Sequence, residues 1–222
     1  VSVTVHRPCQ NSRGDDDVYL SSGRGPFCWA QDIEYYITNY GRPYLNAYSN
    51  INACNIALEN WQTAEGSQAE RNYLAAQAYG LRAYSYFCLV NWYGQPYREE
   101  TAEQDLGVVI RLDSRVVRDY PERASVADVY RQINHDLDSA MILFDESPKS
   151  NNVYKFSKRA AELLKSRVAL YMGRWDDVIE YGERLSTNKY SLATISTMTN
   201  AQLSHDAEYN FISSTSPETV WM

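Results

Sequence analysis

The chain has 222 residues, of which 44% are hydrophobic and 22% charged, and this composition excludes an intrinsically disordered chain. The formal net charge of −7 argues against a nucleic-acid partner, because such binding needs a clustered positive field. No apolar run approaches the roughly 20 residues that a membrane-spanning helix needs.

Residues 1–43 are predicted to be a loop-rich opening region. They contain three successive aspartates at 15–17 and the turn-forming pair Gly25 and Pro26. We expect a helical domain at 44–193 to follow, and then a polar tail at 194–222 that is rich in Ser, Thr and Asn.

Residues 44–94 predict two helices. In the first, apolar residues recur with helical spacing from Ala47 to Trp61. In the second, which ends at Gly94, they form two stripes, and a helix with two apolar faces is normally covered on both sides. Such a pair of helices buries its faces only by stacking on further pairs, so it predicts a helical scaffold. One stripe contains Tyr79, Ala83, Tyr86, Val90 and Tyr93, and the other contains Leu74, Ala78, Leu81, Cys88 and Trp92.

Residues 95–124 are predicted to be a long insertion between the second and third helices. This segment contains Pro96, Gly107 and Pro121 and the extended run 108–110. A connector of this length inside a compact domain either has a function or covers the core, and the sequence leaves both open.

The third helix is predicted by an N-terminal signal. Ser125 followed by Asp128 is typical of a helix start, and Pro148 ends the pattern. Asp136 and Asp138 are expected on one exposed side of this helix, where no partner for a general acid/base role is evident in the sequence. The inward-facing residues are Val126, Tyr130, Ile133, Leu137, Ala140 and Phe144.

Two more helices are expected after it. Ser157 predicts the start of a fourth helix, which ends at 172–174, and Asp176 with Asp177 favours the start of a fifth. Ala161, Leu164, Val168 and Tyr171 are expected to face inward in the fourth, and Val178, Tyr181 and Leu185 in the fifth.

Residue patterns that carry catalysis or bind metals are missing from the sequence. His6, His135 and His205 are scattered, and no phosphate-binding glycine loop or Cys-x-x-Cys pair occurs. We therefore predict no enzymatic activity, no cofactor and no metal. Cys54 and Cys88 are expected to be small buried side chains on helix faces. Cys9 and Cys28 would form a disulfide only in an exported protein, and the sequence leaves their pairing open.

The aromatic content is unusual, with 19 Tyr and 5 Trp. A flat ring covers the apolar C–H face of a sugar, while Asn, Asp and Arg side chains bind its hydroxyls. The opening region is therefore either a glycan-binding platform or a loop that its own aromatic residues hold on the helices. Its aromatic residues without a helical stripe are Tyr19, Phe27, Trp29, Tyr35, Tyr36 and Tyr40.

Five segments in order resemble the SusD/RagB family of nutrient-binding proteins. They are residues 44–59, 76–94, 107–109, 125–137 and 160–175, and the second contains LRAYSYF and ends in NWYG. Gln77 and Ala78 stand where this family usually has Glu-Ala. The resemblance implies an all-α fold of tetratricopeptide-like helical hairpins with long irregular loops.

The resemblance also implies a function at the cell surface. Members of this family are lipid-anchored on the outer face of the outer membrane of Bacteroidetes-type bacteria, where they capture glycans or peptides for a SusC-like TonB-dependent transporter. Neither the family's lipobox cysteine nor its C-terminal half is recognisable here, so we expect a longer natural protein. In starch-binding members the loop before the first of these helices contacts the sugar. By type and location, the implied stacking residues are Trp29 and Tyr40, the implied hydroxyl partners are Asn39 and Arg42, and further candidates are Asp17 and Arg24.

Other functions remain alternatives at this point. A peptide-capturing member of the same family would share the scaffold, and a generic tetratricopeptide adaptor would bind a peptide in a concave helical groove. A glycosidase of helical-barrel type would need a paired acid and carboxylate, which no segment shows.

Overall fold

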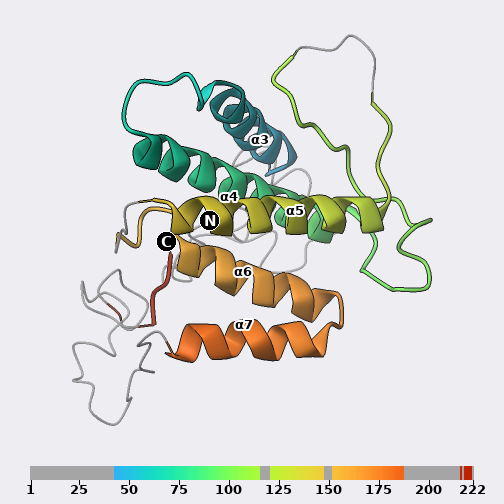
Figure 1. Cartoon of the computed structure of the whole chain (residues 1–222). Helices are drawn as coiled ribbons and strands as arrows, with labels where there is room; N and C mark the ends of the chain where they lie inside the picture. Colours follow the sequence, from blue (N-terminus) through green and yellow to red (C-terminus); the bar gives the residue numbers. More distant parts are fainter. Residues whose placement is uncertain (1–42, 116–120, 148–151, 188–215, 217, 222) are drawn as a thin grey trace, which may run out of the picture. The chain divides into compact units, whose positions relative to one another are not determined.

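The computed structural model describes residues 43–115, 121–147, 152–187, 216 and 218–221, and within these ranges it contains five helices and no strand (Figure 1). The helices are α3 (Pro43–Asn60), α4 (Gln68–Tyr93), α5 (Val126–Asp145), α6 (Lys158–Tyr171) and α7 (Trp175–Thr187). The predicted all-α fold is therefore confirmed. None of the helices in the described ranges combines the length and the apolarity that crossing a membrane requires.

The chain divides into two compact units, Val1–Asn46 and Ala47–Met222. The first unit contributes only the beginning of α3 to the described residues. All contacts below lie within the second unit.

Serine side chains begin α4, α5 and α6. The Ser125 hydroxyl accepts a hydrogen bond from the Asp128 backbone N–H at 3.0 Å, and Ser157 does the same for Ala160 at 3.4 Å, so both predicted helix starts are confirmed. The start of α4 was not predicted. Here Ser67 is the N-cap, and Glu70 completes a capping box, which satisfies backbone donors that the helix itself leaves free.

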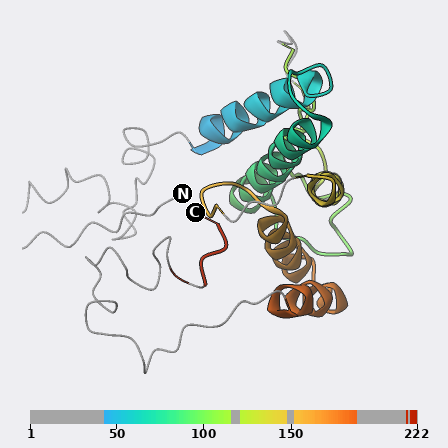
Figure 2. The same cartoon turned by 60° about the vertical axis from the view of Figure 1, so that its left-hand side comes forward.

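Successive helices from α4 to α7 pack as antiparallel neighbours (Figures 1 and 2). Asn72, near the start of α4, donates to the Glu146 carboxylate just after α5 at 2.9 Å. Near the other end of α4, the Tyr130 hydroxyl of α5 donates to Asn91 at 3.5 Å. The turn between α6 and α7 is short because Gly173 adopts a positive φ of 71°, which suits the end of a helix.

The core forms mainly between α4 and α5. All six residues of the stripe predicted for the third helix are buried, which confirms that prediction. In α3, Ala47, Ile51 and Cys54 are buried as predicted, while Leu58 of the helix and Trp61 just after it are only half-buried. The three inward residues predicted for the fifth helix are half-buried in α7, because this helix packs against α6 alone among the described helices.

The second predicted stripe of α4 is largely wrong. Leu74, Leu81 and Trp92 are exposed by 46%, 36% and 53%, Cys88 is half-buried, and only Ala78 is buried. The face that packs against α5 includes Ala83, Tyr86 and Val90, and the opposite side of the helix has no comparable neighbour among the described helices. Periodicity shows that a face is apolar, but the contacts of the fold decide whether it is covered.

Tyr171 of α6 also departs from the inward position expected for it. Its side chain is 46% exposed, although its ring meets that of Phe87 edge to face at 5.1 Å between centroids. The ring therefore lies at the border of the core, where a tyrosine can keep its hydroxyl in water.

The connector after α4 covers part of the core. Val108 is buried, and backbone hydrogen bonds join Gly107 to Ala124 and Ala124 to Val108 at 2.8 and 3.0 Å. The Tyr48 hydroxyl of α3 donates to the Val109 carbonyl at 2.7 Å. Of the two interpretations that the sequence left open, covering of the core is the one that these contacts support.

Candidate functional site

The glycan-binding residues predicted from the sequence all lie outside the described residues. This holds for Asp17, Arg24, Trp29, Asn39, Tyr40 and Arg42. Cys9, Cys28, His6 and His205 lie outside them as well. These site assignments and the possible disulfide therefore stay predictions.

A buried polar cluster joins α3, α4 and α5. Arg82 binds Asp136 through two hydrogen bonds, from Nε to Oδ2 at 2.8 Å and from Nη2 to Oδ1 at 2.7 Å. Its Nη1 donates to Asn55 Oδ1 at 2.8 Å, and Gln132 donates to Asp136 at 2.8 Å. The side chains of Arg82 and Asp136 are 6% and 0% exposed. The expectation that Asp136 lies on an exposed side of the helix is thus wrong, because it pairs with an arginine 54 residues earlier on another helix.

Asp138 does lie on an exposed side of the helix. Its side chain is 53% exposed, but it forms an ion pair with Lys165 of α6. His135 is exposed, and its Nδ1 lies 3.6 Å from Asp136 Oδ1. No group of three or more His, Cys, Asp or Glu side chains in the described part of the chain could hold a metal ion.

The same cluster also holds the connector after α4. The Asn55 amide donates to the carbonyls of Arg111 and Asp113 at 3.1 and 3.0 Å. The Tyr86 hydroxyl donates to the Arg111 carbonyl at 2.7 Å. Since every one of these bonds connects parts of the fold, and the ion pair is buried, the cluster serves the architecture and offers no surface to a ligand.

Burial dominates the electrostatics of this region. Burial raises the pKa of the Cys54 thiol to about 11 and the pKa of the Tyr86 hydroxyl to about 12. Burial alone would lower the pKa of Arg82, but the hydrogen bonds and the charge of Asp136 outweigh it and raise that pKa. Arg82 is therefore a permanent cation, and Cys54 stays a neutral thiol at physiological pH.

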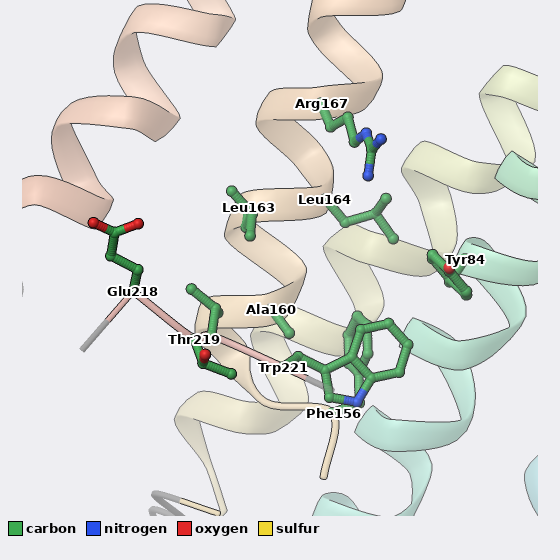
Figure 3. A pocket seen from close by; sticks show the side chains of 10 residues that line it. Tyr84, Phe156, Ala160, Leu163, Leu164, Arg167, Glu218, Thr219 and Trp221 are labelled. Atoms are coloured by element: carbon green, nitrogen blue, oxygen red, sulfur yellow. The ribbon is translucent and has the colours of Figure 1, made fainter. Parts of the chain in front are cut away.

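A pocket of about 470 Å³ opens between α6 and residues 218–221 (Figure 3). Its size lies within the range of small-molecule sites, roughly 300–1,000 Å³. Leu163, Leu164 and Ala160 of α6 form one side. Tyr84 of α4 and Trp221 reach it from two other segments of the chain.

Three aromatic rings form the floor of this pocket and fix one another. The Trp221 ring meets the rings of Tyr84 and Phe156 edge to face, each at 5.0 Å between centroids. Phe156 is itself only 2% exposed, because it packs against α4 where Gly80 has no side chain. Edge-to-face packing is a favourable arrangement for aromatic pairs, so the three rings support one another in the floor.

The polar groups of the pocket are few and lie at its rim. Apart from the Tyr84 hydroxyl and the Trp221 indole N–H of the floor, they come from Arg167 of α6 and from Glu218 and Thr219. Figure 3 shows Arg167 and Glu218 on opposite sides. Arg167 forms no ion pair and no hydrogen bond with the residues that the structure describes.

Sequence reasoning missed this pocket. Tyr84 is part of the helix motif and Trp221 lies in the polar tail, and nothing in the sequence indicates that the two meet. Trp221 comes 34 residues after the last residue of α7, Thr187, and no periodicity relates positions on different elements. The one available signal was an isolated tryptophan in an otherwise polar tail.

The comparison with protein families identifies the family to which the chain belongs. The model of the SusD-like family, described as starch-binding and associating with the outer membrane, matches residues 15–170. Because these residues are well over half of the chain, the protein belongs to the SusD-like family. The resemblance seen in the sequence is thereby confirmed. No curated protein sequence matches the chain significantly.

Solved structures agree with this assignment. A SusD-like carbohydrate-binding protein from Bacteroides vulgatus ATCC 8482 is 26% identical with a TM-score of 0.68, and the match covers 81% of this chain and 36% of that protein. A putative sugar-binding protein from the same organism is also 26% identical with a TM-score of 0.64, covering 81% and 42%. A laminarin-binding SusD-like protein, 19% identical with a TM-score of 0.57 over 72% and 33%, shares the fold. The chain thus spans less than half the length of these relatives.

Proposed function

We propose that this protein captures glycans at the cell surface and delivers them to a SusC-like TonB-dependent transporter of the outer membrane. It performs no catalysis in this role. An N-terminal lipid anchor holds it on the outer membrane, and the transporter imports the captured sugar.

The observation that carries the proposal is the family match over residues 15–170, in a family described as starch-binding and associating with the outer membrane. The fold supports it, because two similar solved structures are described as carbohydrate- or sugar-binding proteins. The net charge of −7 argues against nucleic acid as the ligand.

The ligand site proposed for this function includes the aromatic opening region. In it, Trp29 and Tyr40 stack on sugar rings, Asn39 and Arg42 bind hydroxyls, and Asp17 with Arg24 contributes at the rim. The support for this assignment is chemical, since flat rings next to amide, carboxylate and guanidinium groups are the side chains that sugars require.

The test is a screen of the full-length protein against soluble polysaccharides and mucin glycans, by affinity electrophoresis and calorimetry. Trp29→Ala is expected to weaken the best ligand about fivefold or more, because one aromatic contact contributes on the order of 1 kcal/mol. Trp175→Ala is the matched control. Trp175 lies on α7, is 64% exposed and lines no part of the pocket, so its removal should leave binding unchanged.

The outcome separates the alternatives. Glycan binding that depends on Trp29 supports the proposed function. If the full-length protein binds no glycan but retains peptides from a digest, the peptide-capturing member of the family is the correct interpretation. Equal losses in both variants would contradict the assignment of Trp29.

A further inference from the structure

The pocket beside Trp221 combines an aromatic floor with an aliphatic wall. The rings of Tyr84, Phe156 and Trp221 pack against one another in the floor, and the wall on α6 is aliphatic. An exposed apolar surface of this kind favours a ligand with an apolar face. The C–H face of a sugar ring provides one, and a volume of about 470 Å³ accommodates a ligand of one or two sugar rings.

The charge at the pocket further restricts the class of ligand that fits it. Arg167 is a permanent cation at the rim and has no acidic partner among the described residues. Two other cations of α6 are paired, since Lys158 and Lys165 each form an ion pair with an aspartate of α5. A guanidinium beside an apolar surface binds a carboxylate well, because its planar donors match both carboxylate oxygens.

The opposite rim has the complementary chemistry. Glu218 and Thr219 carry oxygen atoms of the kind that accept hydrogen bonds from sugar hydroxyls. With Arg167 and Glu218 on opposite sides, a bound ring has one preferred direction, with its carboxylate toward α6 and its hydroxyls toward residue 218 (Figure 3).

We propose that this pocket is a second sugar site, and that it binds acidic sugars of the uronic-acid type through Arg167 and the aromatic floor at Trp221. The inference rests on the proposed function, because it names the sugar class that one site of a glycan-capturing protein accepts. It adds a site that is separate in sequence from the opening region around Trp29.

The experiment measures binding of digalacturonic acid and of neutral digalactose to the full-length protein by calorimetry at low ionic strength. The acidic disaccharide is expected to bind more tightly, and rising salt should weaken it selectively. Arg167→Gln should lower the affinity for the acidic disaccharide by about tenfold or more, which is the usual effect of losing a charge-assisted hydrogen bond, and should leave the neutral disaccharide unaffected.

Two further variants complete the design. Arg184→Gln removes the same charge from α7, where Arg184 pairs with Glu180 and lines no part of the pocket, so it should not change either affinity. Trp221→Phe keeps a ring in the floor but reduces its area, and it should weaken both disaccharides. A variant that retains the native helix content in circular dichroism reports on binding and not on folding.

Three results would overturn the inference. The first is equal affinity for the acidic and neutral disaccharides in the unchanged protein, and the second is an Arg167→Gln variant with undiminished affinity for the acidic one. The third is displacement of the acidic disaccharide by a short peptide with a free carboxylate that binds more tightly. If glycans bind in a Trp29-dependent way but the pocket ignores acidic sugars, only this inference fails. If no glycan binds anywhere, the proposed function fails as well.

Discussion

Two charged side chains meet inside an apolar core where α4 packs against α5. Arg82 and Asp136 are both almost fully buried, and each would be costly to bury alone. Their bidentate contact, together with Asn55 and Gln132, satisfies the charges and most of their hydrogen-bonding capacity. A buried pair of this kind contributes more to specifying which helix faces meet than to net stability. In this protein it also sets the position of the connector after α4, through Asn55.

We expect Asp136→Asn to destabilise the protein by about 3–5 kcal/mol, because it leaves the Arg82 guanidinium buried without a counter-charge. Urea unfolding followed by circular dichroism measures the change. Asp138→Asn is the matched control on the same helix. Its partner is Lys165 and its side chain is 53% exposed, so its removal should cost less than about 1 kcal/mol. Equal costs for the two variants would show that the buried pair has no special role.

At the scale of the elements, one glycine decides how closely Phe156 approaches α4. A Cβ atom at Gly80 would lie 2.1 Å from the Phe156 ring, which is closer than any real contact. Glycine normally weakens a helix by about 1 kcal/mol relative to alanine, so its presence in the middle of α4 needs a packing reason. The reason is that Phe156 occupies the space, and in turn supports Trp221 in the floor of the pocket.

Gly80→Ala is therefore expected to destabilise the protein by about 1–3 kcal/mol, since overpacking outweighs the gain in helix propensity. Gly182→Ala on α7 is the control, because nothing lies within 4 Å of the Cβ that it adds. This second change should leave stability unchanged or raise it by up to about 1 kcal/mol. Thermal unfolding of both variants gives the comparison. A stabilised Gly80→Ala protein would contradict the packing described for Phe156.

At the scale of the whole molecule, one buried thiol and two buried tyrosine hydroxyls make the free energy of unfolding depend on pH in the alkaline range. Burial raises the pKa of Cys54 from 9.0 to about 11, and the pKa values of Tyr86 and Tyr130 from 10.0 to about 12. At a pH between the unfolded and the folded pKa of each group, the unfolded chain has lost the proton that the folded protein still holds. The free energy of unfolding must therefore fall as the pH rises from about 9 to about 12.

Urea unfolding at a series of pH values measures this fall, which should amount to at least about 1 kcal/mol. Cys54→Ala removes one of the three groups and is expected to make the fall shallower between about pH 9 and about pH 11. An unchanged slope in that variant would show that the Cys54 thiol ionises as freely in the folded protein as in the unfolded chain.

Much of the helical scaffold can be predicted from the sequence alone, because local physics fixes it. The serine caps at Ser125 and Ser157 act on backbone groups three residues away, and the break at Gly173 depends on its own φ. The stripe of α5 is amphipathic over its whole length, so its buried face follows from spacing. The order of five motif segments was enough to identify the SusD-like family, which the family model confirms.

Only the tertiary structure shows the contacts between residues that are distant in sequence. Asp136 and Asp138 are only two positions apart on α5. Asp136 is buried in an ion pair with Arg82 of α4, whereas Asp138 lies at the surface and pairs with Lys165. Leu81 and Trp92 have the same spacing as core residues, yet they are exposed because the fold places no comparable neighbour beside them in the described part of the chain. The pocket depends on Tyr84, Phe156 and Trp221 meeting from three separate segments. Spacing along a chain determines which face of a helix is apolar, but only packing in three dimensions determines what that face meets.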